Sequence, residues 1–162
     1  MTVTTHRGGA QPASSAPFRV RAARRGDAEA IRQLLAELGF PDAADAQTVH
    51  WIISHPEMEI YVACDSHDKP IGMLSLSHRP QLRMKGRIAT IDELVVTSAW
   101  RKKGVGKELL RHALQRAKVL SVKRVELVNK SGRADSAQGF YQACGLSEAD
   151  AVVFRVPELE RK

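Results

Sequence analysis

Residues 88–128 constrain the fold of this chain more than any other segment. A long run of apolar and β-branched residues ends at Val96, a turn with two glycines follows, and apolar residues then recur at helical spacing over 106–119. A second strand pattern lies at 123–128. Two strands joined through a helix in this way are expected to be parallel, with a right-handed crossover. The segment therefore predicts an α/β fold.

The rest of the sequence adds strands and helices to this unit. Further strands are predicted at 18–21, 59–64, 71–76 and 151–156. Helices are predicted from Asp27 to Gly39, from Pro41 to Ser54 and from Ser136 to Cys144, with a polar, basic loop at 79–86. The turn at 65–70 makes the strands on either side of it a hairpin. This order indicates a mixed β-sheet with helices on both faces.

The length of 162 residues fits one domain, which we assign to 17–162. Residues 1–16 are rich in Gly, Ser, Thr, Ala and Pro without periodicity, and we expect them to form a disordered tail. No apolar run approaches the roughly 18 residues of a membrane span, and no secretion signal is recognisable. Cys64 and Cys144 lie in apolar stretches, so we interpret both as free buried thiols of a cytoplasmic protein.

The charge of the chain limits its partners only loosely. A formal net charge of +7 favours an anionic ligand, but it does not choose among nucleotides, phosphates, nucleic acid and membrane surfaces. No nucleic-acid-binding motif is present, and only 5% of the residues are aromatic. The six histidines form no HxxxH or HExxH pair, so no metal site is predicted.

The glycine turn at 101–107 reads RKKGVGK. A strand that enters such a turn and then a helix leaves backbone N–H groups free at the helix start, where the helix dipole also favours negative charge. Gly104 and Gly106, on either side of Val105, lack the Cβ atoms that would block a phosphate. Four cations add attraction: Arg101, Lys102, Lys103 and Lys107. The turn therefore predicts a phosphate site.

Two common phosphate-binding motifs do not fit this turn. A P-loop would need glycine at position 101 and serine or threonine at 108, where the chain has Arg101 and Glu108. A GxGxxG dinucleotide fingerprint would need glycine at 109, which is Leu109. Neither ATP hydrolysis nor NAD chemistry is therefore indicated.

The turn matches a different pattern, together with a second segment. Arg101-x-x-Gly104-x-Gly106 resembles the [QR]xxGx[GA] motif with which the GNAT superfamily of N-acetyltransferases cradles the pyrophosphate of acetyl-CoA. The segment SAQGFYQACGL at 136–146 resembles the AxxFYxxxGF segment of that family, and Arg24-Arg25-Gly26-Asp27 fits its usual opening. The resemblance spans 18–157. It implies a mostly antiparallel sheet with a splayed parallel strand pair at the acetyl-CoA site.

The resemblance also assigns roles along the central strand. Leu94, Val95 and Val96 are implied to offer backbone groups to the pantetheine arm and to the thioester carbonyl. Glu93 is implied to act as general base, directly or through water, or to bind the amine. Asp92 is the reserve candidate, and strand alternation is expected to place the two carboxylates on opposite faces. A structural or exposed carboxylate at position 93 is the alternative.

Tyr141 is implied to lie near the sulfur of CoA and to protonate the leaving thiolate, because a phenol has an ordinary pKa of ~10. A core aromatic ring is the alternative. Many relatives carry an asparagine seven residues earlier, where this chain has Ala134. Asn129 and Arg133 lie nearby in the sequence, but neither is assigned that role.

The function implied by the resemblance is transfer of an acetyl group from acetyl-CoA to a primary amine by direct attack in a ternary complex. The stretches DELVV and FYQACGL are similar to the branch that includes aminoalkylphosphonate and aminoglycoside acetyltransferases, which indicates a small-molecule acceptor. Acetylation of protein amino groups and a non-catalytic acyl-CoA-binding module are the alternatives. A homodimer remains open, and neither a nucleic acid nor a membrane is an expected partner.

Overall fold

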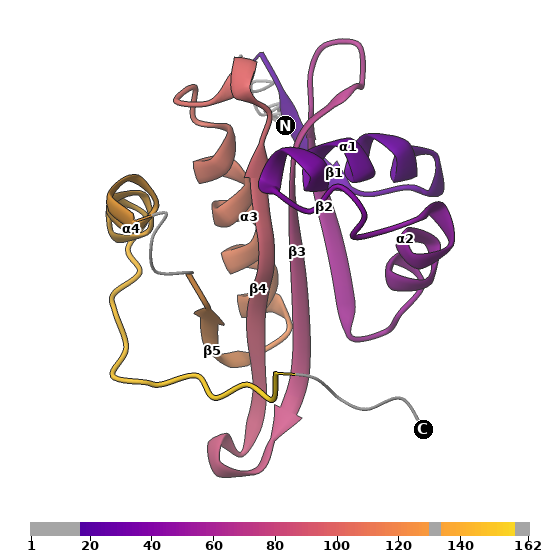
Figure 1. Ribbon diagram of the computed structural model, residues 1–162. Coiled ribbons are helices and arrows are strands. Elements are labelled where there is room, and N and C mark those ends of the chain that lie inside the picture. The colour runs from indigo at the N-terminus through magenta and orange to yellow at the C-terminus, as the bar shows by residue number, and fades with distance from the viewer. Residues whose placement is uncertain (1–16, 130–133, 158–162) are drawn as a thin grey trace, which may run out of the picture. The chain divides into compact units, whose positions relative to one another are not determined.

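The computed structural model describes residues 17–129 and 134–157 (Figure 1). The predicted tail at 1–16 and Arg133 lie outside the described residues. The chain divides into two compact units, Met1–Leu127 and Val128–Lys162, which we describe separately. Within the described part of the chain, none of the helices is both long and apolar enough to cross a membrane.

The first unit holds a five-stranded sheet in the order β1-β2-β3-β4-β5. Its strands are β1 (Arg19–Ala22), β2 (Met58–Cys64), β3 (Pro70–Gln81), β4 (Gly86–Val96) and β5 (Val122–Leu127). Neighbours from β1 to β4 are antiparallel, whereas β4 and β5 are parallel. The predicted mixed, mostly antiparallel sheet with one parallel pair is confirmed.

Helices cover both faces of this sheet, as predicted. On one face, α1 (Ala28–Leu38) and α2 (Ala46–Ile53) pack against alternate residues of the strands, including Met73 and Val95. On the other face lies α3 (Val105–Val119), behind β3 and β4 in Figure 1. The second predicted helix begins later than expected, because the Asp45 side chain accepts a hydrogen bond from the Thr48 N–H and caps the helix there.

The β3–β4 hairpin is much longer than the sequence indicates. The strand predicted at 71–76 continues to Gln81, and the predicted loop at 79–86 shrinks to a short turn at Leu82–Met84. Polar residues near the strand end suggested a loop. They are nevertheless paired, for example His78 with Ala89, and both of these side chains are buried. Pairing with an apolar partner strand thus overrides the local composition.

Close contact between α3 and the sheet depends on a glycine in β3. A Cβ atom at Gly72 would lie 3.0 Å from the Val95 carbonyl oxygen, 3.2 Å from Val105 and 3.3 Å from Leu109. Further along α3, the Arg116 guanidinium donates to the Glu59 carboxylate of β2 at 2.8–2.9 Å. The two contacts fix both ends of α3 against the same sheet.

The second unit holds α4 (Ala134–Ala143), which ends before Gly145 with φ of 87°. The closing strand predicted at 151–156 is wrong. In the described part of the chain these residues form no strand, and Val152, Val153 and Phe154 are exposed. A pattern of β-branched residues favours a strand only where a neighbouring strand supplies the hydrogen-bond ladder.

Both cysteines are free thiols, as predicted, but their environments differ. Cys64 is fully buried at the end of β2, and burial raises the pKa of its thiol to about 11. Cys144 is only partly buried, so its interpretation as a buried thiol is wrong. It follows the last residue of α4, where only part of the side chain is covered.

A buried ion pair joins β1 to the start of α1. The Arg21 guanidinium makes two hydrogen bonds to the Asp27 carboxylate, at 2.8 and 3.0 Å, and a third to Asp68 at 3.0 Å. The same Asp27 carboxylate accepts the Arg24 N–H at 2.7 Å instead of capping α1 itself. Burial alone would raise the pKa of Asp27, but the Arg21 and Arg24 bonds lower it below its ordinary value.

We expect Asp27→Asn to lower the free energy of unfolding by about 3 kcal/mol at neutral pH, because Arg21 loses its main buried partner. Since the folded pKa of Asp27 is depressed, its contribution is fully present above the unfolded pKa of about 3.9 and is lost as pH falls through the folded pKa. Urea unfolding at several pH values measures both effects. Asp68→Asn, at the more exposed of the two carboxylate partners of Arg21, serves as control. An Asp27→Asn loss no larger than that of the control would contradict the prediction.

Candidate active site

The turn between β4 and α3 has an unusual backbone. Lys102 and Gly104 have φ of 58° and 84°, which directs the chain sharply into the helix. Nothing lies within 4 Å of the place a Gly104 Cβ would occupy. The Glu108 N–H donates to the Gly104 carbonyl at 3.0 Å, so the N–H groups of residues 105–107 precede the repeating bonds of α3. These groups and the helix dipole can hold an anion.

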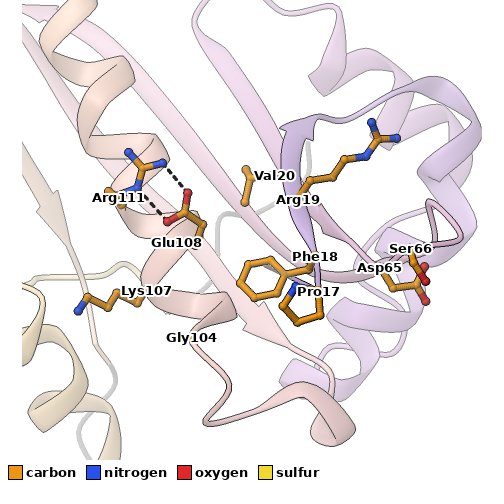
Figure 2. Close-up of a pocket in the computed structure, with 10 residues that line it drawn as sticks. All are labelled: Pro17, Phe18, Arg19, Val20, Asp65, Ser66, Gly104, Lys107, Glu108 and Arg111. Carbon is orange, nitrogen blue, oxygen red and sulfur yellow. Dashed lines mark hydrogen bonds and ion pairs between the residues drawn. The ribbon is translucent and has the colours of Figure 1, made fainter. Parts of the chain in front are cut away.

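The four predicted cations of the turn have different surroundings. All are exposed, but Arg101 donates to the Val96 carbonyl at 3.0 Å and lies 3.9 Å from Glu37. The Lys103 ammonium lies 5.2 Å above the ring of Trp100. Arg101 and Lys103 therefore also stabilise the turn, whereas Lys107 extends from the first turn of α3 (Figure 2).

The end of β4 is tied to α1 through one carboxylate. Glu37 accepts hydrogen bonds from the Thr97 hydroxyl at 2.7 Å and from the Ser98 N–H at 3.1 Å. This contact could not be predicted from the sequence, because Glu37 occupies an ordinary polar position of the helix. It ties α1 to the place where the strand stops and the glycine turn begins.

One edge of β4 becomes open just before this turn. The parallel pairing with β5 runs only from Arg87–Val122 to Ile91–Leu127. Backbone groups of β4 beyond Ile91 on that edge therefore have no β5 partner, as a splayed strand pair requires. Leu94, Val95 and Val96 lie in this stretch and still pair with β3 on their other edge.

Two of the predicted cofactor-binding residues can contribute only their backbone. The Val95 side chain is 5% exposed and belongs to the core under α1 and α2. The Val105 side chain is 1% exposed and packs beside Gly72. Because both side chains are enclosed, any contact that these two residues make with a ligand must come from their main chain.

A β-bulge at Asp92 changes the predicted arrangement of the two carboxylates. Glu93 pairs with Ser75, but the next pair is Ile91 with Leu76, so Asp92 is an extra residue in β4. Ile91 and Leu94 pair with Leu76 and Leu74, which point to one face of β3, so Asp92 and Glu93 between them both fall on the other face. Glu93 hydrogen-bonds to Ser75 there, and Ser77 lies near Asp92. The prediction of opposite faces is therefore wrong.

The Glu93 carboxylate is positioned to hold or release a proton. It shares its face with Met73 and Val95, the side covered by α1 and α2, and it is half-buried. Burial raises the pKa of Glu93, the Ser75 hydrogen bond opposes this, and the nearby Asp92 charge raises it further. Partial loss of solvent around the carboxylate also raises the pKa of Asp92, although the residue as a whole is exposed. A carboxylate with a raised pKa is a better proton acceptor near neutral pH.

Tyr141 lies in the last turn of α4 and belongs to the second unit. Its ring contacts Phe140 edge to face, with centroids 5.2 Å apart. Burial raises the pKa of the Tyr141 phenol above its ordinary value, and the neighbouring Cys144 raises this pKa further. The phenol thus stays protonated at neutral pH, as a proton donor must.

A hollow of about 750 Å³ opens beside the N-terminal half of α3 (Figure 2). Gly104 and Lys107 line it from the turn, and Phe18 points toward it from the chain before β1. The Glu108 carboxylate and the Arg111 guanidinium pair on the helix side, at 2.5–2.8 Å. One flank of the glycine turn is therefore open.

Comparison with known proteins now identifies the family. The model of the acetyltransferase (GNAT) family matches residues 28–146, which is most of the chain. The chain belongs to the GNAT acetyltransferase family. It is accordingly an acyltransferase enzyme, and the GNAT family generally uses acetyl-CoA. No curated protein matches the sequence.

Solved GNAT-like structures agree with this assignment. An aminoglycoside acetyltransferase from an uncultured soil metagenomic sample is 19% identical, with a TM-score of 0.76 over 89% of this chain and 97% of that one. Glucosamine-6-phosphate N-acetyltransferase from Arabidopsis thaliana is 21% identical, with a TM-score of 0.75 over 87% and 99%. A transcriptional regulator from Bacillus halodurans is 27% identical, with a TM-score of 0.75 over 86% and 98%. The GNAT fold is therefore confirmed.

Proposed function

We propose that this GNAT enzyme transfers an acetyl group from acetyl-CoA to the primary amine of a small molecule, by direct attack in a ternary complex. One observation carries the proposal. The half-buried Glu93 carboxylate, the open edge of β4 and the anion-binding turn follow one another along a single continuous stretch, 93–107. Acetyl transfer from a CoA thioester needs a proton acceptor, backbone partners for the donor and a phosphate site. This stretch offers a candidate for each of them.

The turn supplies the donor-binding end of this stretch. The N–H groups at the start of α3 would donate to the pyrophosphate, and Lys102 and Lys107 would add charge attraction. Backbone groups of Leu94–Val96 on the edge of β4 that β5 does not cover would pair with the pantetheine arm, although the Val96 carbonyl accepts from Arg101 in this structure. An N–H of this stretch would stabilise negative charge that develops on the thioester oxygen.

Two side chains would move protons. Glu93 would take a proton from the attacking amine, directly or through a water molecule, and Tyr141 would give one to the departing thiolate. No nucleophilic side chain is needed if the amine attacks the thioester directly. The small-molecule acceptor is supported by the aminoglycoside and glucosamine-6-phosphate acetyltransferases among the similar structures.

A panel of amines tests the proposal, with released CoA detected by a thiol reagent. Polyamines, amino sugars, aminoalkylphosphonates and lysine-containing peptides cover the acceptor classes. Faster CoA release with a small amine than with any peptide supports the proposal. Preference for a peptide would overturn the small-molecule assignment. Tight CoA binding without release over the whole panel would identify a binding module instead.

With an active acceptor, we expect Glu93→Gln to lower kcat/KM by about a hundredfold near neutral pH. This is the lower end of the usual range, because Asp92 lies beside the lost base. The loss should shrink at high pH, where more of the acceptor is already a free amine. A pH–rate profile measures this, with Glu29→Gln on the exposed side of α1 as control. A uniform loss at every pH would exclude Glu93 as the base.

A further inference from the structure

Ser75 is a buried polar residue whose two side-chain hydrogen bonds both join it to Glu93. Its side chain is 3% exposed, and it lies on β3 between the buried Leu74 and Leu76. A hydroxyl in such surroundings is unfavourable unless it is hydrogen-bonded. The register places Ser75 directly opposite Glu93 on β4.

The Ser75 hydroxyl hydrogen-bonds to both the main chain and the side-chain carboxylate of Glu93. The Glu93 N–H donates to the Ser75 oxygen at 3.0 Å, and the Ser75 hydroxyl donates to the Glu93 carboxylate. A serine hydroxyl can do both at once, because it has one proton and two lone pairs. Main chain and carboxylate of Glu93 are thereby fixed to the same point on β3.

We propose that Ser75 is a positioning residue of the acetyl transfer, which fixes the orientation of the Glu93 carboxylate and favours its proton-accepting form. The inference rests on the function proposed above. Ser75 need not touch either substrate, because it acts through Glu93 alone.

The neighbouring groups show why such a residue is needed. Burial and the adjacent Asp92 both favour the protonated form of Glu93, and the Ser75 hydroxyl is the group that opposes them. Without it, the carboxylate would stay protonated up to a higher pH and would be free to rotate. Ser77 lies near Asp92, two residues further along β3. It therefore offers a control position beside the other carboxylate.

The experiment compares Ser75→Ala, Ser77→Ala and Ser75→Thr in the full chain, after thermal melts confirm that each variant folds. Carboxyl-carbon NMR follows the titration of Glu93 without any substrate, with Glu93→Gln used to assign its signal. Profiles of kcat/KM against pH then use the active acceptor.

In Ser75→Ala, we expect the Glu93 titration and the acid limb of the profile to move together to higher pH, by about one pH unit or more. Ser75→Thr, which keeps the hydroxyl, should restore both. Ser77→Ala should leave the acid limb in place.

Four results would overturn the proposal. If neither quantity moves in Ser75→Ala while turnover persists, Ser75 does not position Glu93, but the proposed acetyl transfer stands. If Ser75→Ala moves the Glu93 titration but not the acid limb of the kcat/KM profile, the base is not Glu93. The same conclusion follows if the acid limb moves in Ser77→Ala alone. If wild-type protein releases no CoA with any amine, the proposed function itself fails, whatever the titration shows.

Discussion

Tyr141→Phe is expected to lower turnover by about 10²–10⁴-fold while acetyl-CoA affinity and folding stay unchanged. The substitution keeps the ring that packs edge to face on Phe140 and removes only the hydroxyl. If that hydroxyl protonates the leaving thiolate, each turnover must release a thiolate without help. The raised pKa of Tyr141 is consistent with this role, because the phenol keeps its proton at neutral pH.

Single-turnover kinetics with an active acceptor measure the effect on chemistry itself. The chain contains two tyrosines, so Tyr61→Phe is a matched control. Tyr61 donates to Glu59 under α3 and is expected to affect stability rather than turnover. Tyr141→Phe and Glu93→Gln should combine less than additively, because both residues serve one transition state. Wild-type turnover in Tyr141→Phe would leave Tyr141 with a packing role only.

Gly106→Glu is expected to abolish binding of acetyl-CoA. Gly106 lies in the first turn of α3, beside the N–H groups proposed to hold the pyrophosphate. A glutamate there would bring a side chain and a negative charge into that site. Folding should be retained, since an acidic residue in the first turn of a helix interacts favourably with the helix dipole.

Calorimetry with acetyl-CoA measures the loss, and a thermal melt confirms the fold. Gly26→Glu is the matched control, because Gly26 is exposed, has open space around its Cβ position and lies before α1, in another part of the unit. Its affinity should equal that of wild type. Unchanged affinity in a folded Gly106→Glu variant would show that the anion-binding turn does not hold the donor.

Elements with a local signal could be predicted closely from the sequence. The helix predicted at 106–119 is α3 at Val105–Val119, because apolar residues at helical spacing mark its buried side. Gly39, predicted to end the first helix, does so with φ of 104°. The parallel β4–β5 pair followed from the crossover rule, which depends only on the order of the elements.

Features that depend on pairing between distant segments could not be predicted. The bulge at Asp92 exists only relative to β3, so no pattern within β4 reveals that both carboxylates lie on one face. The contacts of Ser75 follow from the same register. Conversely, the pattern at 151–156 is typical of a strand, but no partner strand is paired with it in the described part of the chain. The roles of Glu93, Tyr141 and the turn remain predictions.

The absence of a side chain at Gly72 has a consequence for the thermodynamics of ligand binding. Because β3, β4 and the first turn of α3 are in direct contact there, the N–H groups at the helix start are held by the sheet and not by a loop. A phosphate that binds them would order few additional backbone torsions. The conformational entropy lost on binding should then come mainly from the exposed lysine side chains, so shortening these side chains should alter the entropy of binding more than its heat.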